Sequence, residues 1–313
     1  MSRWVVIGGT GYIGAAVCHR LVDSGQEVVS LSRAHSGVPE CEGNPRYSHV
    51  SLELVPGQLP ESLFQHGDRI VYAAGLADRR TCERRPELAL WLNSECPLAL
   101  LRCADAAGAE SFTYLSSVKA VRPPSGVVAD EGAGEPAVDA YGKSKWAGEQ
   151  QLFGFSAQCR LNVIRPAAVY GEGIGQLRSR GRAGRLKGLL GVVGPLLPVV
   201  PASGRRSFVS LEDLVRAIVM VTEARDCHRK VFIAAEPRFY DLPGILAEYG
   251  VRVRASERLT RFLLWPFRTL GRRAMAGSLL ELENSELYSA AHLRRALPWR
   301  AEQRYSRFLR GIQ

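Results

Sequence analysis

Three groups of residues in the first half of the chain have the types and the spacing to carry chemistry. A glycine-rich turn, Gly8-Gly9-Thr10-Gly11-Tyr12-Ile13-Gly14, follows a short apolar run. A serine pair, Ser116-Ser117, ends a later apolar run, and Tyr141-Gly142-Lys143-Ser144-Lys145 comes one segment after it. In this order they indicate a dinucleotide site that serves a tyrosine able to move a proton.

The elements around the glycine-rich turn are those that a dinucleotide fingerprint requires. Residues 4–7 suit a buried strand, residues 15–22 repeat apolar side chains at helical spacing, and residues 27–31 predict a second strand. Gly8 then allows the tight turn, Gly11 lets the backbone approach a pyrophosphate, and Gly14 permits close packing of the helix. The alternative is a turn that merely connects a strand to a helix.

The end of the second predicted strand bears on the choice of cofactor. An acidic residue there selects NAD through the ribose 2′-hydroxyl, whereas a basic residue accommodates the 2′-phosphate of NADP. The chain has Leu31-Ser32-Arg33, with no Asp or Glu at the strand end. Ser32 and Arg33 therefore favour NADP over NAD, unless Arg33 is simply a solvated surface charge.

Tyr141 and Lys145 are four residues apart, so they share one face of a helix that opens at Asp139. A free phenol has a pKa of about 10, and a neighbouring ammonium and a positive nicotinamide ring favour the phenolate and lower that pKa. Lys145 could also hydrogen-bond the nicotinamide ribose, and Ser117 would donate to the substrate oxygen. The alternative is an amphipathic helix with a surface tyrosine and lysine.

On these residues the chain resembles the extended short-chain dehydrogenase/reductase family, in its nucleotide-sugar epimerase and reductase branch, over almost its whole length. The resemblance implies that Ser117, Tyr141 and Lys145 are catalytic. It also implies that Ser117 and an arginine, Arg205 or Arg206, contact the substrate, the arginine at its diphosphate. Together with the strand-end pair, the expected cofactor contacts are Gly8, Gly11, Tyr12, Ile13, Gly14, Ser32, Arg33, Ala73, Ala74, Gly75, Asn93, Tyr141, Lys145, Pro166 and Val169.

The chain departs from the family pattern directly after Ser117. Dehydratases of the family usually carry an acid pair there, whereas this chain has Val118-Lys119-Ala120, which argues against water elimination. Val121-Arg122-Pro123-Pro124 replaces the common Val-Tyr-Gly, so the shape of the substrate pocket is expected to differ. Gly277-Ser278-Leu279 and Leu297-Pro298-Trp299 resemble the tail of bacterial members that make sugars for surface polysaccharides.

The pattern of elements predicts an α/β fold, a Rossmann-type doubly wound parallel sheet with a small C-terminal substrate-binding subdomain. With 313 residues, 46% of them hydrophobic, the chain can bury a large core. We expect residues 1–170, joined by 206–234, to form the dinucleotide-binding domain. Residues 171–205 and 235–313 would form the subdomain over the carboxyl ends of the strands.

The formal net charge of +10 suits anionic ligands such as NADP and a sugar nucleotide. Arginines at 178, 180, 182 and 185 contribute to it. Nucleic acid is a weaker reading because no nucleic-acid module accompanies the charge. An anionic membrane surface, or an ordinary solvated basic surface, is a further alternative.

Cysteine usage and apolar stretches bear on the compartment. The seven cysteines are scattered without a C-x-x-C pair, which predicts reduced thiols in the cytoplasm. The six histidines do not cluster with the cysteines, so we expect no metal site. No signal peptide is expected before Trp4. Residues 186–200 are too short and broken by Gly and Pro to span a membrane. Residues 259–270 could be an interfacial helix, but core or subunit contact is preferred, and the resemblance implies a homodimer.

Two reactions share this constellation. A 4-keto-sugar reductase would deliver hydride from NADPH while Tyr141 protonates the new hydroxyl, and a 4-epimerase would oxidise C4 and return the hydride to the other face. Two other classes stay open. One is a reductase of a carbonyl that carries no nucleotide, and the other is a non-catalytic NADP-binding sensor.

Overall fold

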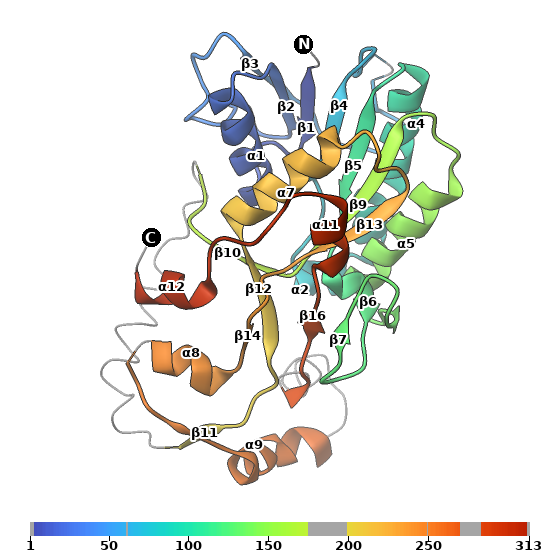
Figure 1. The fold of residues 1–313 in the computed structure, drawn as a ribbon. Coiled ribbons are helices and arrows are strands. Elements are labelled where there is room, and N and C mark those ends of the chain that lie inside the picture. Colours follow the sequence, from blue (N-terminus) through green and yellow to red (C-terminus); the bar gives the residue numbers. More distant parts are fainter. Residues whose placement is uncertain (1–2, 61, 175–198, 249, 270–282, 312–313) are drawn as a thin grey trace.

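The computed structural model describes residues 3–60, 62–174, 199–248, 250–269 and 283–311. At its centre lies a seven-stranded sheet whose neighbouring strands are all parallel (Figure 1). In spatial order the strands are β13 (Lys230–Ala234), β9 (Arg160–Pro166), β5 (Ser111–Leu115), β4 (Arg69–Tyr72), β1 (Trp4–Ile7), β2 (Val28–Ser32) and β3 (Tyr47–Ser51). The predicted α/β class with a doubly wound parallel sheet is confirmed.

Helices cover both faces of the sheet and build two apolar cores. One core packs against α1 (Tyr12–Asp23) and α7 (Leu211–Glu223), and the other against α4 (Cys96–Ala106) and α5 (Ala140–Gly154). Trp4 and Val6 belong to the first core, whereas Val5 and Ile7 belong to the second. Side chains of a strand alternate between the two faces of its sheet, so a strand buried on both must be apolar throughout, as β1 is.

The order of the strands reverses between β1 and β4. The chain runs outward through β2 and β3, then returns to β4 on the other side of β1 and continues through β5, β9 and β13. In open parallel sheets a ligand binds outside the carboxyl ends of the strands at such a reversal. The loops that follow β1, β4 and β5 therefore meet at the expected ligand edge.

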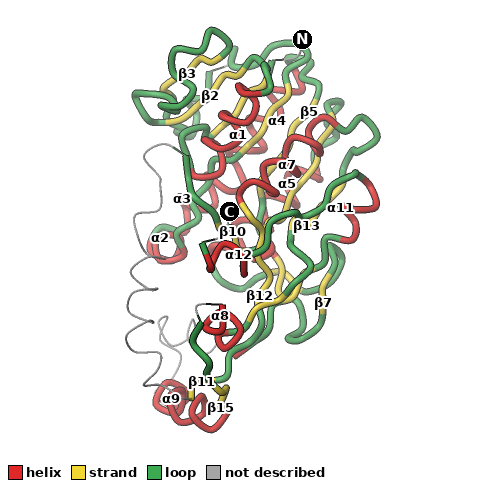
Figure 2. The backbone as a smooth tube through the Cα atoms, turned by 60° about the vertical axis from the view of Figure 1, so that its left-hand side comes forward, coloured by secondary structure: helices red, strands yellow, loops and turns green. Residues whose placement is uncertain are grey.

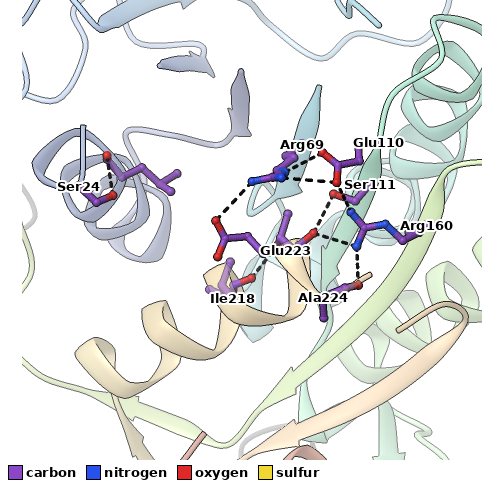
Figure 3. Close-up of polar contacts among 10 residues, drawn as sticks. Ser24, Arg69, Glu110, Ser111, Arg160, Ile218, Glu223 and Ala224 are labelled. Carbon is purple, nitrogen blue, oxygen red and sulfur yellow. Dashed lines mark hydrogen bonds and ion pairs between the residues drawn. The ribbon is translucent and has the colours of Figure 1, made fainter. Parts of the chain in front are cut away.

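At the opposite edge of the sheet, ion pairs join the amino ends of neighbouring strands to each other and to α7 (Figure 3). Glu110 accepts from Arg69 Nε at 2.8 Å and from Arg160 Nη2 at 2.7 Å, and Arg69 also pairs with Glu223 at 3.4 Å. Ser111 donates to the Thr222 carbonyl oxygen at 3.0 Å. These contacts fasten the end of α7 to the strands, away from the ligand edge.

A smaller group of elements lies beyond the carboxyl edge (Figures 1 and 2). Its described residues form a three-stranded sheet, a two-stranded sheet and three helices. The three-stranded sheet consists of β10 (Ala168–Tyr170), β12 (Arg206–Ser210) and β14 (Phe239–Tyr240). The two-stranded sheet consists of β11 (Val199–Pro201) and β15 (Arg254–Ser256). The helices are α8 (Leu242–Glu248), α9 (Glu257–Thr269) and α12 (Tyr305–Arg310). Two ribbons, β6 (Val121–Arg122) with β8 (Glu135–Pro136) and β7 (Val128–Ala129) with β16 (Leu287–Tyr288), flank the ligand edge.

The C-terminal part of the chain is divided differently from the predicted ranges. Strand β12, expected in the dinucleotide domain, pairs with β10 and β14 instead of joining the main sheet. Helix α11 (Ala291–Ala296) and Trp299, expected in the subdomain, pack into the first core, where the Trp299 indole donates to the Asp213 carbonyl oxygen at 2.9 Å. Burial of the large indole against α7 holds this segment on the main sheet. The two-part division itself stays a proposal.

Some sequence features fall outside the described residues. They are the arginines at 178, 180, 182 and 185, most of the apolar stretch 186–200, and Gly277-Ser278-Leu279. Among the helices that are described, none has the length and apolar character needed to cross a bilayer.

Candidate active site

The glycine turn lies at the carboxyl end of β1, where the strand order reverses. Gly8 has a φ of +83°, in the left-handed region, and a Cβ there would lie 2.5 Å from the backbone nitrogen of Ala74. A Cβ on Gly14 would lie 2.1 Å from the carbonyl oxygen of Gly8. Both positions therefore require glycine, the first for its conformation and for the approach of the loop after β4, the second for helix packing.

The turn also presents the start of α1 to the ligand edge. Gly11 is the N-cap of this helix and supplies no side-chain hydrogen bond to the first-turn amides. Such amides, together with the helix dipole, favour an anion. The glycine cradle and these amides fit the pyrophosphate of a dinucleotide.

The end of β2 presents a hydroxyl and a guanidinium. Ser32 Oγ accepts from Thr10 Oγ1 at 2.8 Å and from the amide of Ala34 at 3.1 Å, which ties the strand end to the glycine turn. Arg33 is exposed beside it, and the next acidic residue along the chain is Glu40. The place where NAD-selecting sites put a carboxylate therefore holds Ser32 and Arg33.

Two N-caps bring the serine and the tyrosine together. Ser117 follows β5 and accepts from the amide of Lys119 at 3.1 Å, starting a short 3₁₀ turn. Asp139 accepts from the amide of Gly142 at 3.1 Å and starts α5. Tyr141 thus lies in the first turn of α5, where its phenol is near enough to the Ser117 hydroxyl for that group to favour the phenolate.

The pKa of Tyr141 differs from the sequence-based expectation. Burial raises it above its ordinary value, and the hydrogen bond from Ser117 opposes that rise only in part. The expected lowering by the Lys145 ammonium is not among the causes of the Tyr141 shift. The expectation was therefore wrong in sign for the chain alone, since burial penalises the phenolate.

Lys145 lies in the interior, 5% exposed, on the same face of α5 as Tyr141. Its Nζ donates to the Leu115 carbonyl oxygen at 2.8 Å and lies 4.9 Å from the centre of the Tyr114 ring. Burial lowers the pKa of Lys145 to about 7, and Glu149 and Cys82 act against that lowering. A Cβ on Gly75 would lie 3.1 Å from this Nζ, so the loop after β4 closes directly over the ammonium.

Asn93 connects that loop to α5. It lies in a π-helical segment, Trp91–Glu95, between α3 (Pro86–Leu90) and α4, a distortion often found at functional sites. Its side-chain amide donates to the Leu76 carbonyl oxygen at 3.0 Å and to Ser144 Oγ at 2.9 Å, and its Oδ1 accepts from the amide of Leu76 at 3.1 Å. Asn93 therefore sets the position of the expected cofactor loop.

The remaining expected cofactor residues border the same edge. Ala73 donates its amide to the Ile7 carbonyl oxygen at 2.8 Å, beside the glycine turn. Pro166 is buried at the end of β9, the strand next to β5, and Val169 is half-buried just beyond it. Ile13 packs against the first core, and the Tyr12 hydroxyl donates to the Gly171 carbonyl oxygen at 2.9 Å. Tyr12 thus ties the glycine turn to the chain after β10.

Arg205 and Arg206 have different environments. Arg206 is partly buried and forms an ion pair with Glu286, whereas the side chain of Arg205 is exposed. Lys119 Nζ also binds Glu286, at 2.5 and 2.6 Å from its two oxygens. Burial favours the neutral form of Glu286, but the two cations outweigh it and lower the pKa of this carboxyl. The cluster joins the loop after Ser117 to β12 and to the residue before β16.

A cavity of about 580 Å³ opens beside this cluster. Lys119 and Glu286 line it, with residues 121–125 on one side and residues 137–139, just before the Tyr141 helix, on another. The segment that departs from the family pattern after Ser117 therefore forms part of its wall.

Sequence reasoning missed three charged or nucleophilic groups around Lys145. Glu149 and Arg165 form a buried ion pair, and Cys82, on α2 (Arg79–Arg84), lies close enough to influence the charge of both Tyr141 and Lys145. The position of Glu149, four residues after Lys145, was a visible signal. The partnership with Arg165 on β9 needed the fold.

A nicotinamide-dependent oxidoreductase needs its dinucleotide and its proton-transferring group at one edge of the sheet, and this chain has a glycine turn that fits a dinucleotide at the same edge as Ser117 and Tyr141. It is an enzyme of the extended short-chain dehydrogenase/reductase class. More specifically, it belongs to the NAD dependent epimerase/dehydratase family, whose model matches residues 4–234.

Individual relatives are similar to different extents. The UDP-glucose 4-epimerase of Rhizobium meliloti (strain 1021) is 31% identical over 172 residues, which cover 51% of this chain and 50% of that protein. The match thus spans only half of that relative's length. The UDP-glucose 4-epimerase of Streptomyces lividans is 26% identical over 248 residues, 72% of this chain and 70% of that protein.

Among solved structures, the UDP-glucuronic acid 4-epimerase from Bacillus cereus in complex with NAD superposes with a TM-score of 0.73 at 16% identity. The alignment covers 98% of this chain and 96% of that one. At this identity the likeness concerns the fold, and it extends through the elements beyond the ligand edge.

Proposed function

We propose that this chain transfers hydride between a nicotinamide cofactor and C4 of a nucleotide-linked sugar, with 4-epimerisation as its net reaction. The observation that carries the proposal is that Ser117, after β5, and Tyr141 and Lys145, on α5, converge at the sheet edge that also holds the glycine turn. The two related UDP-glucose 4-epimerases support a nucleotide sugar as the substrate class and epimerisation over net reduction.

In this proposal Tyr141 is the acid and base at the sugar oxygen. The phenolate form of Tyr141 takes the proton of the C4 hydroxyl while the C4 hydrogen leaves with its electron pair, and the resulting phenol returns that proton to the sugar oxygen when the hydride comes back. The nicotinamide, when bound, supplies the hydride acceptor. Ser117 donates to the same sugar oxygen, and the charged form of Lys145 favours the phenolate of Tyr141.

The substrate is proposed to enter from the cavity beside Lys119 and Glu286. Arg206 is the arginine best placed to hold the diphosphate, because it already holds a carboxylate inside the molecule. Its guanidinium would exchange Glu286 for phosphate oxygens, and Lys119 would keep Glu286 paired. Arg205, exposed beside it, is the weaker candidate.

We propose NADP as the preferred cofactor, on the strength of the Ser32–Arg33 strand end. The related Bacillus cereus structure holds NAD, so this preference is a point on which the two proteins would differ. We also propose that the chain acts as a homodimer in the cytoplasm. None of its seven cysteines is in a disulfide, which supports a reducing compartment.

The test is turnover of the purified chain with UDP-, GDP- and dTDP-sugars and their 4-keto derivatives, with NAD(H) or NADP(H) added separately. Interconversion of two sugars without net change of cofactor supports the epimerase. Stoichiometric loss of NADPH with a 4-keto sugar would instead make it a reductase. Cofactor binding without turnover of any sugar would overturn the nucleotide-sugar proposal in favour of another carbonyl substrate or a sensor.

Replacement of Tyr141 by phenylalanine separates an enzyme from a sensor. Loss of the acid–base group is expected to reduce turnover by about 10²- to 10⁴-fold while cofactor binding persists. Tyr240→Phe serves as a matched loss of one phenol hydroxyl, in β14 and outside this cavity, where the hydroxyl accepts from the amide of Ser306. Equal turnover by the phenylalanine variant and the wild type would remove Tyr141 from the mechanism.

A further inference from the structure

A buried carboxylate lies one helical turn behind the proposed catalytic lysine. Glu149 is 1% exposed and accepts from Arg165 through Nε at 2.9 Å and Nη2 at 2.5 Å. Ser116, the neighbour of Ser117, donates its hydroxyl to the same carboxylate. Arg165 is itself buried and donates its third nitrogen to the Glu131 carbonyl oxygen at 3.0 Å. The group is fully satisfied and closed to water.

The end of β5 holds this carboxylate and the lysine with consecutive residues. The Leu115 carbonyl oxygen accepts from Lys145, and the Ser116 hydroxyl donates to Glu149. Because Lys145 and Glu149 are four residues apart on α5, they stand on one face, in line with Tyr141. Proton-transferring phenol, ammonium and buried carboxylate thus follow one another along a single stripe of the helix.

The groups that face Lys145 differ in the charge they can supply. From β5 come a carbonyl oxygen and the Tyr114 ring, from the π-helical segment comes the neutral amide of Asn93, and Tyr141 is a neutral phenol. Cys82, on α2, has its pKa raised by burial and is a neutral thiol at neutral pH. Glu149 is therefore the neighbour that brings a standing negative charge.

We propose that Glu149, fixed by Ser116 and Arg165, is a positioning residue that keeps the Lys145 ammonium charged and directed to the edge where Tyr141 and the cofactor meet. Without that charge, burial would leave the lysine neutral over more of the working pH range. The catalytic consequence rests on the proposed function. The effect on the charge of Lys145 is a property of the folded chain alone.

The competing explanation is that Glu149 and Arg165 only join α5 to β9. Buried ion pairs are often replaceable without loss of stability, so packing alone would not demand a carboxylate here. The chain contains a matched control in Glu110, which accepts from Arg69 and Arg160 at the far edge of the sheet (Figure 3). Glu110→Gln removes a comparable carboxylate from an arginine network without approaching Lys145.

The direct test is the titration of Lys145 by NMR in the full chain without cofactor. The sequence has only five lysines (Lys119, Lys143, Lys145, Lys187 and Lys230), so ¹³Cε-lysine labelling gives few signals, and the signal missing from Lys145→Met identifies Lys145. The wild-type midpoint is expected near pH 7. Glu149→Gln should lower it by about one unit or more, whereas Glu149→Asp, which keeps the charge, should restore most of the difference.

Three outcomes decide the proposal. A lowered midpoint in Glu149→Gln with an unchanged one in Glu110→Gln supports it, and an unchanged midpoint in both overturns it. If Glu149→Gln does not fold, the double variant Glu149→Gln with Arg165→Met removes the whole pair, and a wild-type midpoint in that protein overturns the proposal equally. Replacement of both charges by neutral groups of similar size is the substitution that buried pairs tolerate.

Turnover supplies the second readout. In Glu149→Gln the alkaline requirement for activity should move to higher pH, because a neutral lysine no longer favours the phenolate of Tyr141, and Glu110→Gln should keep the wild-type profile. A shifted NMR midpoint in a chain that turns over no nucleotide sugar would reject the proposed function and leave the role of Glu149 intact. Turnover of a nucleotide sugar with an unshifted Lys145 midpoint in Glu149→Gln would support the proposed function and reject the role of Glu149.

Discussion

Replacement of Lys145 by methionine is expected to stabilise the cofactor-free chain at acid and neutral pH. The side chain is 5% exposed, and burial lowers its pKa from 10.5 to about 7. A lowering of about 3.5 corresponds to a penalty on the order of 5 kcal/mol on the charged form in the fold. Methionine has a similar length and no charge, so it escapes this penalty, which is net of the attraction of Glu149, and it loses the hydrogen bond to Leu115 and the contact of the ammonium with the Tyr114 ring.

The sign of the pH dependence follows from proton binding. Below pH 7 the lysine is protonated in both states, so the folded chain bears the whole penalty. Between about pH 7 and 10.5 the unfolded chain binds more protons than the folded one, and the contribution to stability rises by up to about 1.4 kcal/mol per pH unit. Above 10.5 the lysine is neutral in both states and the penalty is gone.

The assay is urea unfolding of wild type and Lys145→Met at pH 6 and pH 9. Titrating thiols and phenols are common to both proteins and cancel in the difference. The stability advantage of the variant is expected to shrink by about 3 kcal/mol between these two pH values. A difference that stays constant from pH 6 to pH 9 would refute the reasoning, because it would mean that Lys145 titrates normally in the fold.

Three other substitutions test separate parts of the site. Gly14→Ala puts a Cβ 2.1 Å from the Gly8 carbonyl oxygen. It should therefore lower the free energy of unfolding in urea by about 2 kcal/mol or more and weaken cofactor binding. A variant that equals the wild type in both measurements would contradict the close packing of α1 on the glycine turn. Glu286→Gln should cost about 2 kcal/mol at pH 7 by leaving Lys119 unpaired. Because the pKa of Glu286 is lowered in the fold, its ionised carboxylate contributes fully to the free energy of unfolding above the ordinary carboxyl pKa of 4.5, and this contribution is lost as the pH falls below that value. If Glu286→Gln destabilised the chain equally at pH 7 and pH 3.5, the contribution of Glu286 would not be ionic. Arg33→Ala should weaken the binding of NADPH by roughly tenfold and change the binding of NADH little, as measured by fluorescence titration. Equal effects on the two affinities would show that Arg33 does not select the cofactor.

The local part of the architecture was predictable because each piece carries its own signal. Residues 4–7 are uninterrupted apolar residues and form β1, and the run before Ser116 forms β5. Gly8 and Gly14 stand where a side chain would collide with backbone. Asp139 starts α5 by the N-cap that its residue type predicts. Such features depend on a few neighbours along the chain.

What could not be predicted depends on partners far apart in the sequence. The Lys119–Glu286 pair joins residues 167 positions apart, and no periodicity links them. The sign of the Tyr141 pKa shift required knowing that burial outweighs the opposing effects of Ser117 and Arg79. The placement of Trp299 depended on the apolar surface that α7 leaves for it. In each case the deciding quantity is a contact or a burial that only the folded chain defines.

The Lys119–Glu286 pair also bears on water elimination. The residues directly after Ser117 offer no carboxylate, but the fold brings Glu286 into the same cavity from the far end of the chain. A dehydratase would need an acid there to protonate the leaving hydroxyl. Lys119 and Arg206 both hold Glu286 and lower its pKa, so at neutral pH it is ionised and has no proton to give. The tertiary structure thus supplies a carboxylate at this place in a form that does not restore the missing acid, which leaves the proposed proton transfer by Tyr141, coupled to hydride transfer at the cofactor, as the chemistry of the site.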